Sequence, residues 1–301
     1  MYYAFIMLST VMFGGGFGLW DLYRKKRGSG IKVSMEATCI GSLSGLIILL
    51  AINGFAFEFT PFSLLMAILS AINGMVFTFC AFRALDYINL SLFSVFSMLG
   101  GMALPFFQGI LLYDEGFTFA KAICLLCITL ALISTIEKSE KKRGTIFYIA
   151  IFILNGMSGV LSKLFIASDL PKISAAGYSV WCAAATALLS GIVWGILSIS
   201  QWRKSYGRND IAPKEEKASW QTYSIGALYG IINRVANFLL VIALANVDAS
   251  VQYPMVTGGT MIVSTIISYF GDKKPGRREI ISVSIAFLGM TALFLIPFFE
   301  K

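Results

Sequence analysis

A small group of polar side chains interrupts one of the most apolar parts of this sequence. Arg234 follows Asn233 directly, and Asn237 comes three residues after Arg234. In a helix, Arg234 and Asn237 therefore share roughly one face. An arginine at the centre of a bilayer costs from about 3 to more than 10 kcal/mol, so such a residue almost always faces a protein interior or a water-filled cavity. A guanidinium in that position can bind a carboxylate or a phosphate through paired hydrogen bonds.

A structural role for Arg234 is the alternative. The guanidinium would then pair with a buried carboxylate, or with backbone carbonyls at an unwound turn. No Asp or Glu occurs at comparable depth in any apolar stretch of the sequence. We therefore favour an anion-binding role, while the structural role stays open.

Other polar residues within apolar stretches extend this candidate cavity. Asn73 falls near the position that Asn233 occupies in the second half of the chain, and Asn155 opens an Asn-Gly-Met-Ser-Gly segment. Amides at membrane depth either join helices or line a pathway, and both roles stay open here. Lys163 lies near one end of its stretch, where a lysine can also extend to water. The remaining candidates are Ser97, Gln252 and Tyr253.

Two tryptophans have an ambiguous position in the sequence. Trp20 and Trp181 both lie near the ends of apolar stretches. They could form aromatic walls of a cavity, but tryptophan concentrates at membrane–water interfaces. We favour the interfacial interpretation for both.

Catalytic and metal chemistry find little support. The chain has no histidine, and the Cys124 and Cys127 pair lies in the middle of an apolar stretch, where packing is a better explanation than a zinc or redox site. No nucleophile and base pair and no glycine-rich phosphate loop can be assembled. We therefore expect no enzyme activity, no metal and no cofactor.

The elements that carry these residues are predicted to be membrane helices. Hydrophobic residues make up 57% of the 301-residue chain and charged residues 13%, whereas a soluble domain has about 25% charged residues. A helix needs roughly 20 apolar residues to cross a bilayer. Ten such stretches are expected, at residues 2–20, 35–54, 61–82, 88–112, 117–136, 146–167, 173–199, 220–245, 249–270 and 278–298. This pattern predicts an all-α membrane protein with ten transmembrane helices, in contact with a lipid bilayer.

Basic residues concentrate on one side of these predicted helices. The connections after the first, third, fifth, seventh and ninth stretches carry 19 of the 24 Lys and Arg residues. Positively charged loops stay in the cytoplasm, so we expect a plasma-membrane protein with these loops inside and both termini outside. This distribution also explains the net charge of +8, and we expect no nucleic-acid partner. The sequence does not indicate an oligomeric state.

The two halves of the chain resemble each other. The strongest internal match pairs three residues of each half at identical spacing, Ala84, Leu85 and Ser91 with Ala243, Leu244 and Ser250. We expect two five-helix repeats, residues 1–140 and 141–301, and transporters built from repeats place the substrate at the repeat interface. Pro105 and Pro254 lie inside repeat-related stretches, where each removes a backbone hydrogen bond. The two prolines could mark points where the helices bend during transport, or they could produce static kinks, and the sequence supports both explanations equally.

The segment ALDYINLSLFSVFSMLGGMALPFFQGILLYDEGFT resembles the EamA-type half of the drug/metabolite transporter superfamily. It has an Ala-Leu step, a short turn, a serine-containing helix and an acidic turn before the last helix of the repeat. The second half departs from this pattern, because Asp272 is followed by Lys273 where the first half has Asp114 and Glu115. The resemblance implies two inverted five-helix repeats around a central cavity lined by helices 1, 3, 4, 6, 8 and 9. It also implies alternating access by rocking, with substrates from amino acids and sugars to phosphorylated metabolites and amphipathic cations.

Together these features predict a secondary transporter, a carrier that moves a small polar metabolite across the plasma membrane by alternating access. That the metabolite is anionic is a hypothesis that depends on Arg234. A multidrug or amphiphile exporter is the alternative within transport. Such an exporter would need a deep carboxylate for cations, and the sequence offers aromatic residues without that acid. A non-transporting membrane partner subunit or a membrane enzyme is the alternative of another class.

Overall fold

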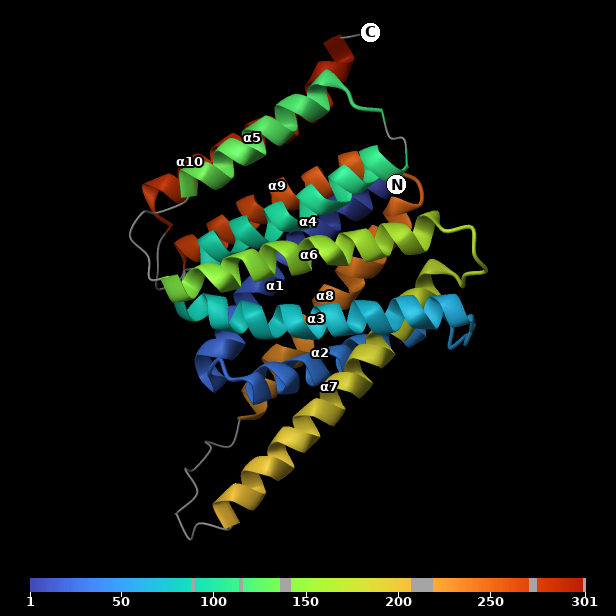
Figure 1. The fold of residues 1–301 in the computed structure, drawn as a ribbon, viewed down its shortest axis with the longest axis vertical. Coiled ribbons are helices and arrows are strands. Elements are labelled where there is room, and N and C mark those ends of the chain that lie inside the picture. The colour runs from blue at the N-terminus through green and yellow to red at the C-terminus, as the bar shows by residue number, and fades with distance from the viewer. Residues whose placement is uncertain (88–89, 114–115, 136–141, 207–218, 271–274, 300–301) are drawn as a thin grey trace.

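The computed structural model describes residues 1–87, 90–113, 116–135, 142–206, 219–270 and 275–299. Within these ranges the regular structure is entirely helical, so the all-α part of the predicted fold class is confirmed. Figure 1 shows the ten helices: α1 (Tyr2–Arg27), α2 (Ile31–Ile52), α3 (Pro61–Tyr87), α4 (Leu90–Leu112), α5 (Phe119–Thr135), α6 (Lys142–Ala167), α7 (Ala175–Tyr206), α8 (Trp220–Leu244), α9 (Ala249–Tyr269) and α10 (Arg277–Phe299).

Six helices are long and apolar enough to cross a membrane. By length and composition these are α1, α2, α3, α6, α7 and α8, judged over the described residues. Shorter apolar helical segments lie within α4, α5 and α10. The chain is therefore consistent with a multi-pass membrane protein.

Several helices extend beyond the apolar stretches that predicted them. α1 continues through a run of basic residues to Arg27, and α7 continues to Tyr206. Lysine, arginine and glutamine are good helix formers, so the backbone stays helical where the hydropathy falls. α1 ends where Gly28 adopts a φ of 91°, a conformation that residues with a Cβ rarely take.

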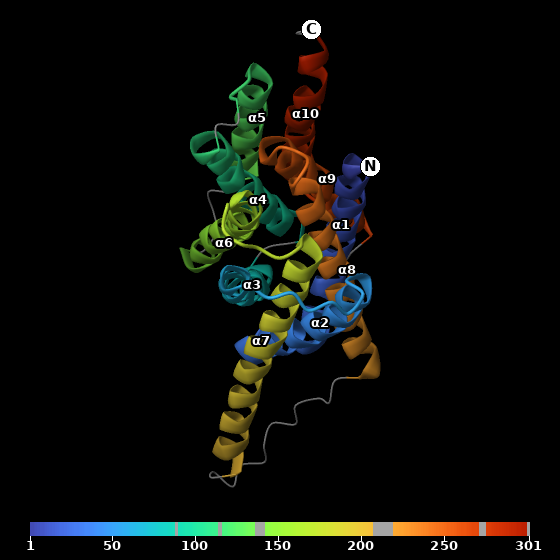
Figure 2. The ribbon, with the colours of Figure 1, turned by 90° about the vertical axis from the view of Figure 1, so that its right-hand side faces the viewer.

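The helices pack as a bundle with a pair at each edge. α5 and α10 lie side by side at one edge, next to α4 and α9, and α2 and α7 contact each other at the opposite edge (Figures 1 and 2). α1, α3, α4, α6, α8 and α9 fill the middle of the bundle (Figure 2). The N-terminus and the end of α10 lie at the same end of the bundle in Figure 1.

The contacts between helices follow a pattern that relates the two halves. α1 packs on α8 and α9, and α6 packs on α3 and α4; α2 packs on α8, and α7 packs on α3. The pairs α2–α7, α4–α9 and α5–α10 join helices that hold the same place in each half. Gly100 on α4 abuts Phe152 of α6, and Gly259 on α9 abuts Thr10 of α1. The helix contacts named here therefore occur in corresponding pairs.

Candidate functional site

A cavity of about 250 Å³ lies in the middle of the bundle. Residues of α1, α2, α3, α4, α6, α7, α8 and α9 line it. The resemblance noted above implies six of these helices, and α2 and α7 contribute in addition. Small-molecule sites usually measure about 300–1,000 Å³, so this cavity has the size for a small metabolite and is too small for a lipid.

Arg234 projects from α8 and is held by α2. Its Nη2 donates a hydrogen bond of 2.8 Å to Oγ of Ser42. A Cβ added at Gly45 would lie 2.5 Å from Cγ of Arg234, so the missing side chain at Gly45 leaves the space for the arginine stem. Among the described residues that line the cavity, Arg234 is the one with a charged side chain. The cavity therefore carries a single fixed positive charge.

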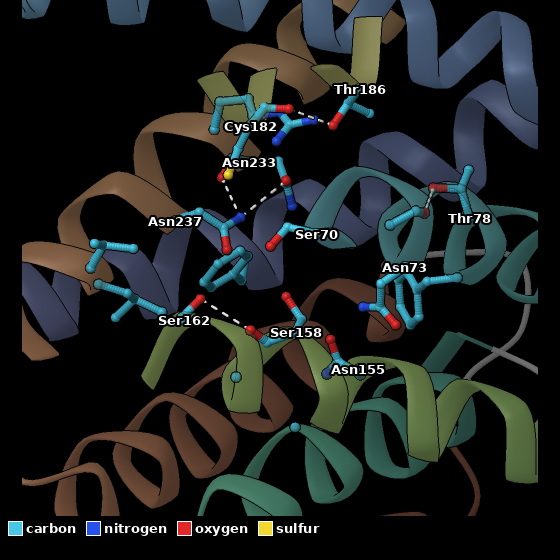
Figure 3. Close-up of a pocket in the computed structure, with 18 of the residues that line it drawn as sticks. Ser70, Asn73, Thr78, Asn155, Ser158, Ser162, Cys182, Thr186, Asn233 and Asn237 are labelled. Carbon is cyan, nitrogen blue, oxygen red and sulfur yellow. Dashed lines mark hydrogen bonds between the residues drawn. The ribbon is translucent and has the colours of Figure 1, made fainter. Parts of the chain in front are cut away.

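The predicted asparagines all line this cavity. Asn237 on α8 donates through Nδ2 to O of Asn233 at 2.8 Å and to its Oδ1 at 3.1 Å (Figure 3). Asn73 on α3 donates to O of Leu154 on α6 at 2.9 Å, and Asn155 on α6 donates across to α4. The two roles left open for Asn73 and Asn155 are thus combined, because each amide joins two helices at the cavity wall.

Two further candidates line the cavity from α9. Gln252 is fully buried and donates through Nε2 to O of Leu240 on α8 at 3.0 Å. The hydroxyl of Tyr253 donates to O of Gly159 on α6 at 3.1 Å. These side chains fix α9 against α8 and α6 beside the cavity.

Two candidates lie elsewhere. The ammonium of Lys163 sits over the ring of Tyr113, 5.4 Å from its centroid, and Lys163 is not among the lining residues. Ser97 is buried inside α4 and does not line the cavity either, although its carbonyl oxygen accepts the 2.7 Å hydrogen bond from Asn155. The sequence shows how deep these residues lie, but it does not show which way they face.

Hydroxyl groups complete the lining, and most of them escaped prediction. Ser70 Oγ and the hydroxyl of Tyr178 lie 2.9 Å apart in a hydrogen bond. Figure 3 shows Ser70, Ser158 and Asn237, from three helices, facing a common space. Some of these hydroxyl groups could have been predicted from their position relative to the asparagines. Ser158 and Ser162 follow Asn155 at three and seven residues, a spacing that places all three on one face of a helix. The hydroxyl-bearing lining residues are Thr38, Ser42, Ser70, Thr78, Ser158, Ser162, Tyr178, Ser179, Thr186, Tyr229, Tyr253 and Thr257.

An aromatic cluster closes the cavity toward the basic helix ends. Trp20 is only 2% exposed and stacks on Tyr229, with 5.3 Å between ring centroids. It also packs against Phe77, Phe82 and Phe93. The interfacial position favoured for Trp20 is therefore wrong, because the ring is enclosed by α1, α3, α4 and α8. Trp181 lies outside the cavity lining and donates from Nε1 to O of Glu58 at 2.8 Å.

Ion pairs lie beyond this aromatic cluster, at the basic ends of the helices. Arg27 on α1 contacts Glu36 on α2 at 2.8 Å, and the Tyr23 hydroxyl donates to Glu36 at 2.9 Å. Arg24 on α1 contacts Asp86 on α3 at 2.9 Å. Glu36 is buried, so a carboxylate does lie inside the bundle, but a guanidinium already neutralises it.

Polar lining residues away from the basic helix ends are exposed. These are Asn237 on α8 and Ser158 on α6, and the two helices make few contacts with each other. The aromatic cluster thus lies on the basic side of the cavity, and exposed polar side chains line it away from that side.

Comparisons with known proteins support the fold and leave the activity open. No model of a protein family matches the chain, and no curated protein matches it. A solved structure described as "Crystal structure of protein" has a similar fold, with a TM-score of 0.65 and 14% sequence identity. The similarity covers 97% of this chain and 96% of that one. At this identity the likeness shows the fold alone, and it shows it for the whole chain.

Proposed function

We propose that this protein is a secondary transporter that moves a small polar anion across the plasma membrane. The observation that carries this proposal is Arg234, the one charged side chain among the described residues of a central, metabolite-sized cavity. Among the described residues its guanidinium donates to Ser42, and the rest of its planar donor edge can pair with a carboxylate or a phosphate. No catalytic activity is part of the proposal.

The proposal includes ten membrane-spanning helices arranged as two inverted five-helix repeats of the drug/metabolite transporter type. The recurrence of helix contacts between α1–α5 and α6–α10 supports this arrangement. The position of the cavity supports it too, because helices from both halves line it and transporters with repeats bind substrate at the repeat interface.

The unequal ends of the cavity support alternating access. Aromatic packing around Trp20 and the Arg24–Asp86 ion pair lie on the basic side, while the lining residues Asn237 and Ser158, away from that side, are exposed. With the basic helix ends in the cytoplasm, the described conformation opens to the outside. Rocking of one repeat against the other would open the basic side of the cavity and close the outer side.

A multidrug or amphiphile exporter is the second candidate. The aromatic residues Phe13, Phe17, Trp20, Phe77 and Tyr229 in the cavity lining favour it. The positive charge of Arg234 opposes it for cationic substrates, since no carboxylate is found among the described lining residues.

A ligand screen on two versions of the protein tests the proposal. The detergent-purified wild type and an Arg234→Ala variant are heated with a metabolite library, because a ligand that binds the native state raises the melting temperature with its saturation. We expect carboxylates or phosphates to stabilise the wild type and to lose this effect in Arg234→Ala. Uptake of the same compounds into proteoliposomes then shows transport without a partner protein. Stabilisation by cations or neutral amphiphiles, unchanged in Arg234→Ala, would instead favour the exporter.

A further inference from the structure

We propose that Gly74 on α3 determines which anions the cavity accepts, by leaving open space in the α3 wall of the cavity while the α8 wall carries Arg234. Arg234 then binds one carboxylate, and the hydroxyl-bearing remainder of the substrate fills the space before Gly74. This inference rests on the proposed transport function and deepens it. It names the substrate class as small monocarboxylates that carry several hydroxyl groups.

Two helix faces with the same residue spacing lead to Gly74. One face belongs to α3 and the other to α8, and each includes four cavity-lining residues at the same spacing: Ser70, Asn73, Gly74 and Phe77 on α3, and Gly230, Asn233, Arg234 and Asn237 on α8. In each set an asparagine is followed directly by the next lining residue, which is Gly74 on α3 and Arg234 on α8. Over the described residues α3 and α8 do not pack extensively against each other. The α8 wall therefore carries the charge, and the α3 wall has no side chain at Gly74.

The space before Gly74 is open. A Cβ added at Gly74 would meet no atom within 4 Å, whereas one added at Gly45 would meet the Arg234 side chain. Gly74 also lies at the centre of the lining face of α3, between Ser70 one turn before and Thr78 one turn after. The glycine is thus not required by helix packing, and the empty volume in front of it belongs to the cavity.

The charge of the lining limits the charge of the substrate. Arg234 can neutralise one negative charge, and a second charge would be buried without a partner, which is costly. A phosphate monoester carries about −1.5 to −2 charges at pH 7, so a carboxylate matches the single guanidinium better. The other polar groups that line the described cavity are amides, hydroxyls, a thiol and the indole N–H of Trp20, which suit neutral hydroxyl groups on the substrate.

Three compounds with the same six-carbon skeleton test this assignment. Gluconate carries one negative charge, glucarate carries two, and sorbitol carries none. Binding is measured by thermal shift over a range of concentrations, and transport by proteoliposome uptake. We expect the wild type to bind gluconate at least about tenfold more tightly than either of the other two compounds. A tenfold difference in affinity corresponds to the free energy of one hydrogen-bonded contact between charged groups.

Variants at Gly74 test the position itself. Gly74→Leu fills the open space and is expected to weaken gluconate binding by about tenfold or more. Gly74→Lys adds a second cation and is expected to reverse the preference, so that glucarate binds more tightly than gluconate. Gly195→Leu is the matched control, because a Cβ at Gly195 on α7 also meets nothing within 4 Å and Gly195 does not line the cavity. This control should bind all three compounds as the wild type does.

The outcomes separate this inference from the transport proposal. Wild-type gluconate binding in Gly74→Leu would overturn the role of Gly74. Failure of Gly74→Leu to fold, when Gly195→Leu folds, would overturn it as well, because the space would not be open. Stabilisation by inorganic phosphate but not gluconate, lost in Arg234→Ala, would overturn the substrate class and leave an anion carrier. If Arg234→Ala matches the wild type for every anion, the proposed function itself fails.

Discussion

At the level of single residues, the site depends on how an arginine is accommodated inside an apolar bundle. α2 provides the accommodation, since Ser42 accepts a hydrogen bond from Arg234 and Gly45 makes room for its stem. The guanidinium is thereby held by one neutral hydroxyl rather than by a carboxylate. Its charge is not cancelled within the lining, so it stays available to an anionic ligand.

Gly45→Ala should disturb the site without removing a polar group. The new Cβ would lie 2.5 Å from Cγ and 2.8 Å from Cβ of Arg234, so the arginine must move. We expect gluconate binding to weaken about tenfold, in line with loss of one charged hydrogen-bonded contact. Thermal-shift titration measures this effect. Gly195→Ala, at an open position outside the cavity, should leave binding unchanged, and equal binding by both variants would contradict the packing argument.

Arg234→Lys separates charge from geometry. Lysine keeps the positive charge but lacks the planar fork that contacts both oxygens of a carboxylate. We expect gluconate affinity between those of the wild type and Arg234→Ala, about tenfold below the wild type. The same titration on the three proteins measures it. Full affinity in Arg234→Lys would show that charge alone is recognised.

The sequence identified the deep amides and the arginine because polar groups at membrane depth are costly and therefore conspicuous. Arg234, Asn237 and Asn73 all line the cavity. The hydroxyl groups could not be identified in this way, since serine and threonine can satisfy themselves on the carbonyl of the preceding turn. Ser162, for example, donates to O of Ser158.

At the level of helices, close crossings at glycines bring the cavity walls together. Gly230 on α8 abuts the backbone of Gly41 on α2. One turn earlier on α8, Gly226 abuts the ring of Tyr23. This crossing lies one turn from Arg234. It therefore sets the distance at which α2 can hold the arginine.

Gly230→Ala should destabilise the protein through this crossing. The added Cβ would overlap the Gly41 backbone, which cannot move aside as a side chain can. We expect the free energy of unfolding to fall by about 1–3 kcal/mol, the usual cost of overpacking. Thermal melting in detergent shows the effect as a lower midpoint. Gly195→Ala gains the same helix propensity without a clash, so an equal midpoint in the two variants would argue against the tight crossing.

The apolar stretches predicted the helices well because burial in a bilayer demands long uninterrupted runs. They predicted helix ends less well, as the basic end of α1 shows. Arg24 and Arg27 continue the helix past the apolar run and pair with Asp86 and Glu36. Such pairing depends on α2 and α3 being near, and the sequence of α1 alone does not contain that information.

At the level of the whole molecule, two kinds of contact close the side of the cavity toward the basic helix ends. Toward the basic helix ends, Trp20 and Tyr229 stack, and Arg24 links α1 to α3 through Asp86. The Ser29 hydroxyl also donates to Asp86. A carrier that alternates must break these contacts to open this side. Their strength therefore sets how often the basic side opens.

Asp86→Asn should shift the protein toward opening on the basic side. The change removes the carboxylate that joins α3 to Arg24, in a pair whose side chains are 15% and 30% exposed. Such partly exposed pairs contribute about 0.2–1 kcal/mol, so the open population should rise by up to about fivefold. A cysteine introduced by Thr78→Cys, on the cavity-lining face of α3, reports this opening. Its labelling by a membrane-impermeant thiol reagent, added on the side of the basic helix ends, should accelerate accordingly.

Asp21→Asn is the matched control for this experiment. Asp21 also pairs with Arg24, at 2.9 Å, but within α1 itself, so its loss changes the local charge equally and releases no contact between helices. Labelling of Thr78→Cys should accelerate with Asp86→Asn and not with Asp21→Asn, after subtraction of the native cysteine background. Equal acceleration by both changes would mean that surface charge near the reagent controls the rate. No acceleration by either would place the barrier in the aromatic cluster around Trp20, which a Trp20→Ala change would then have to lower.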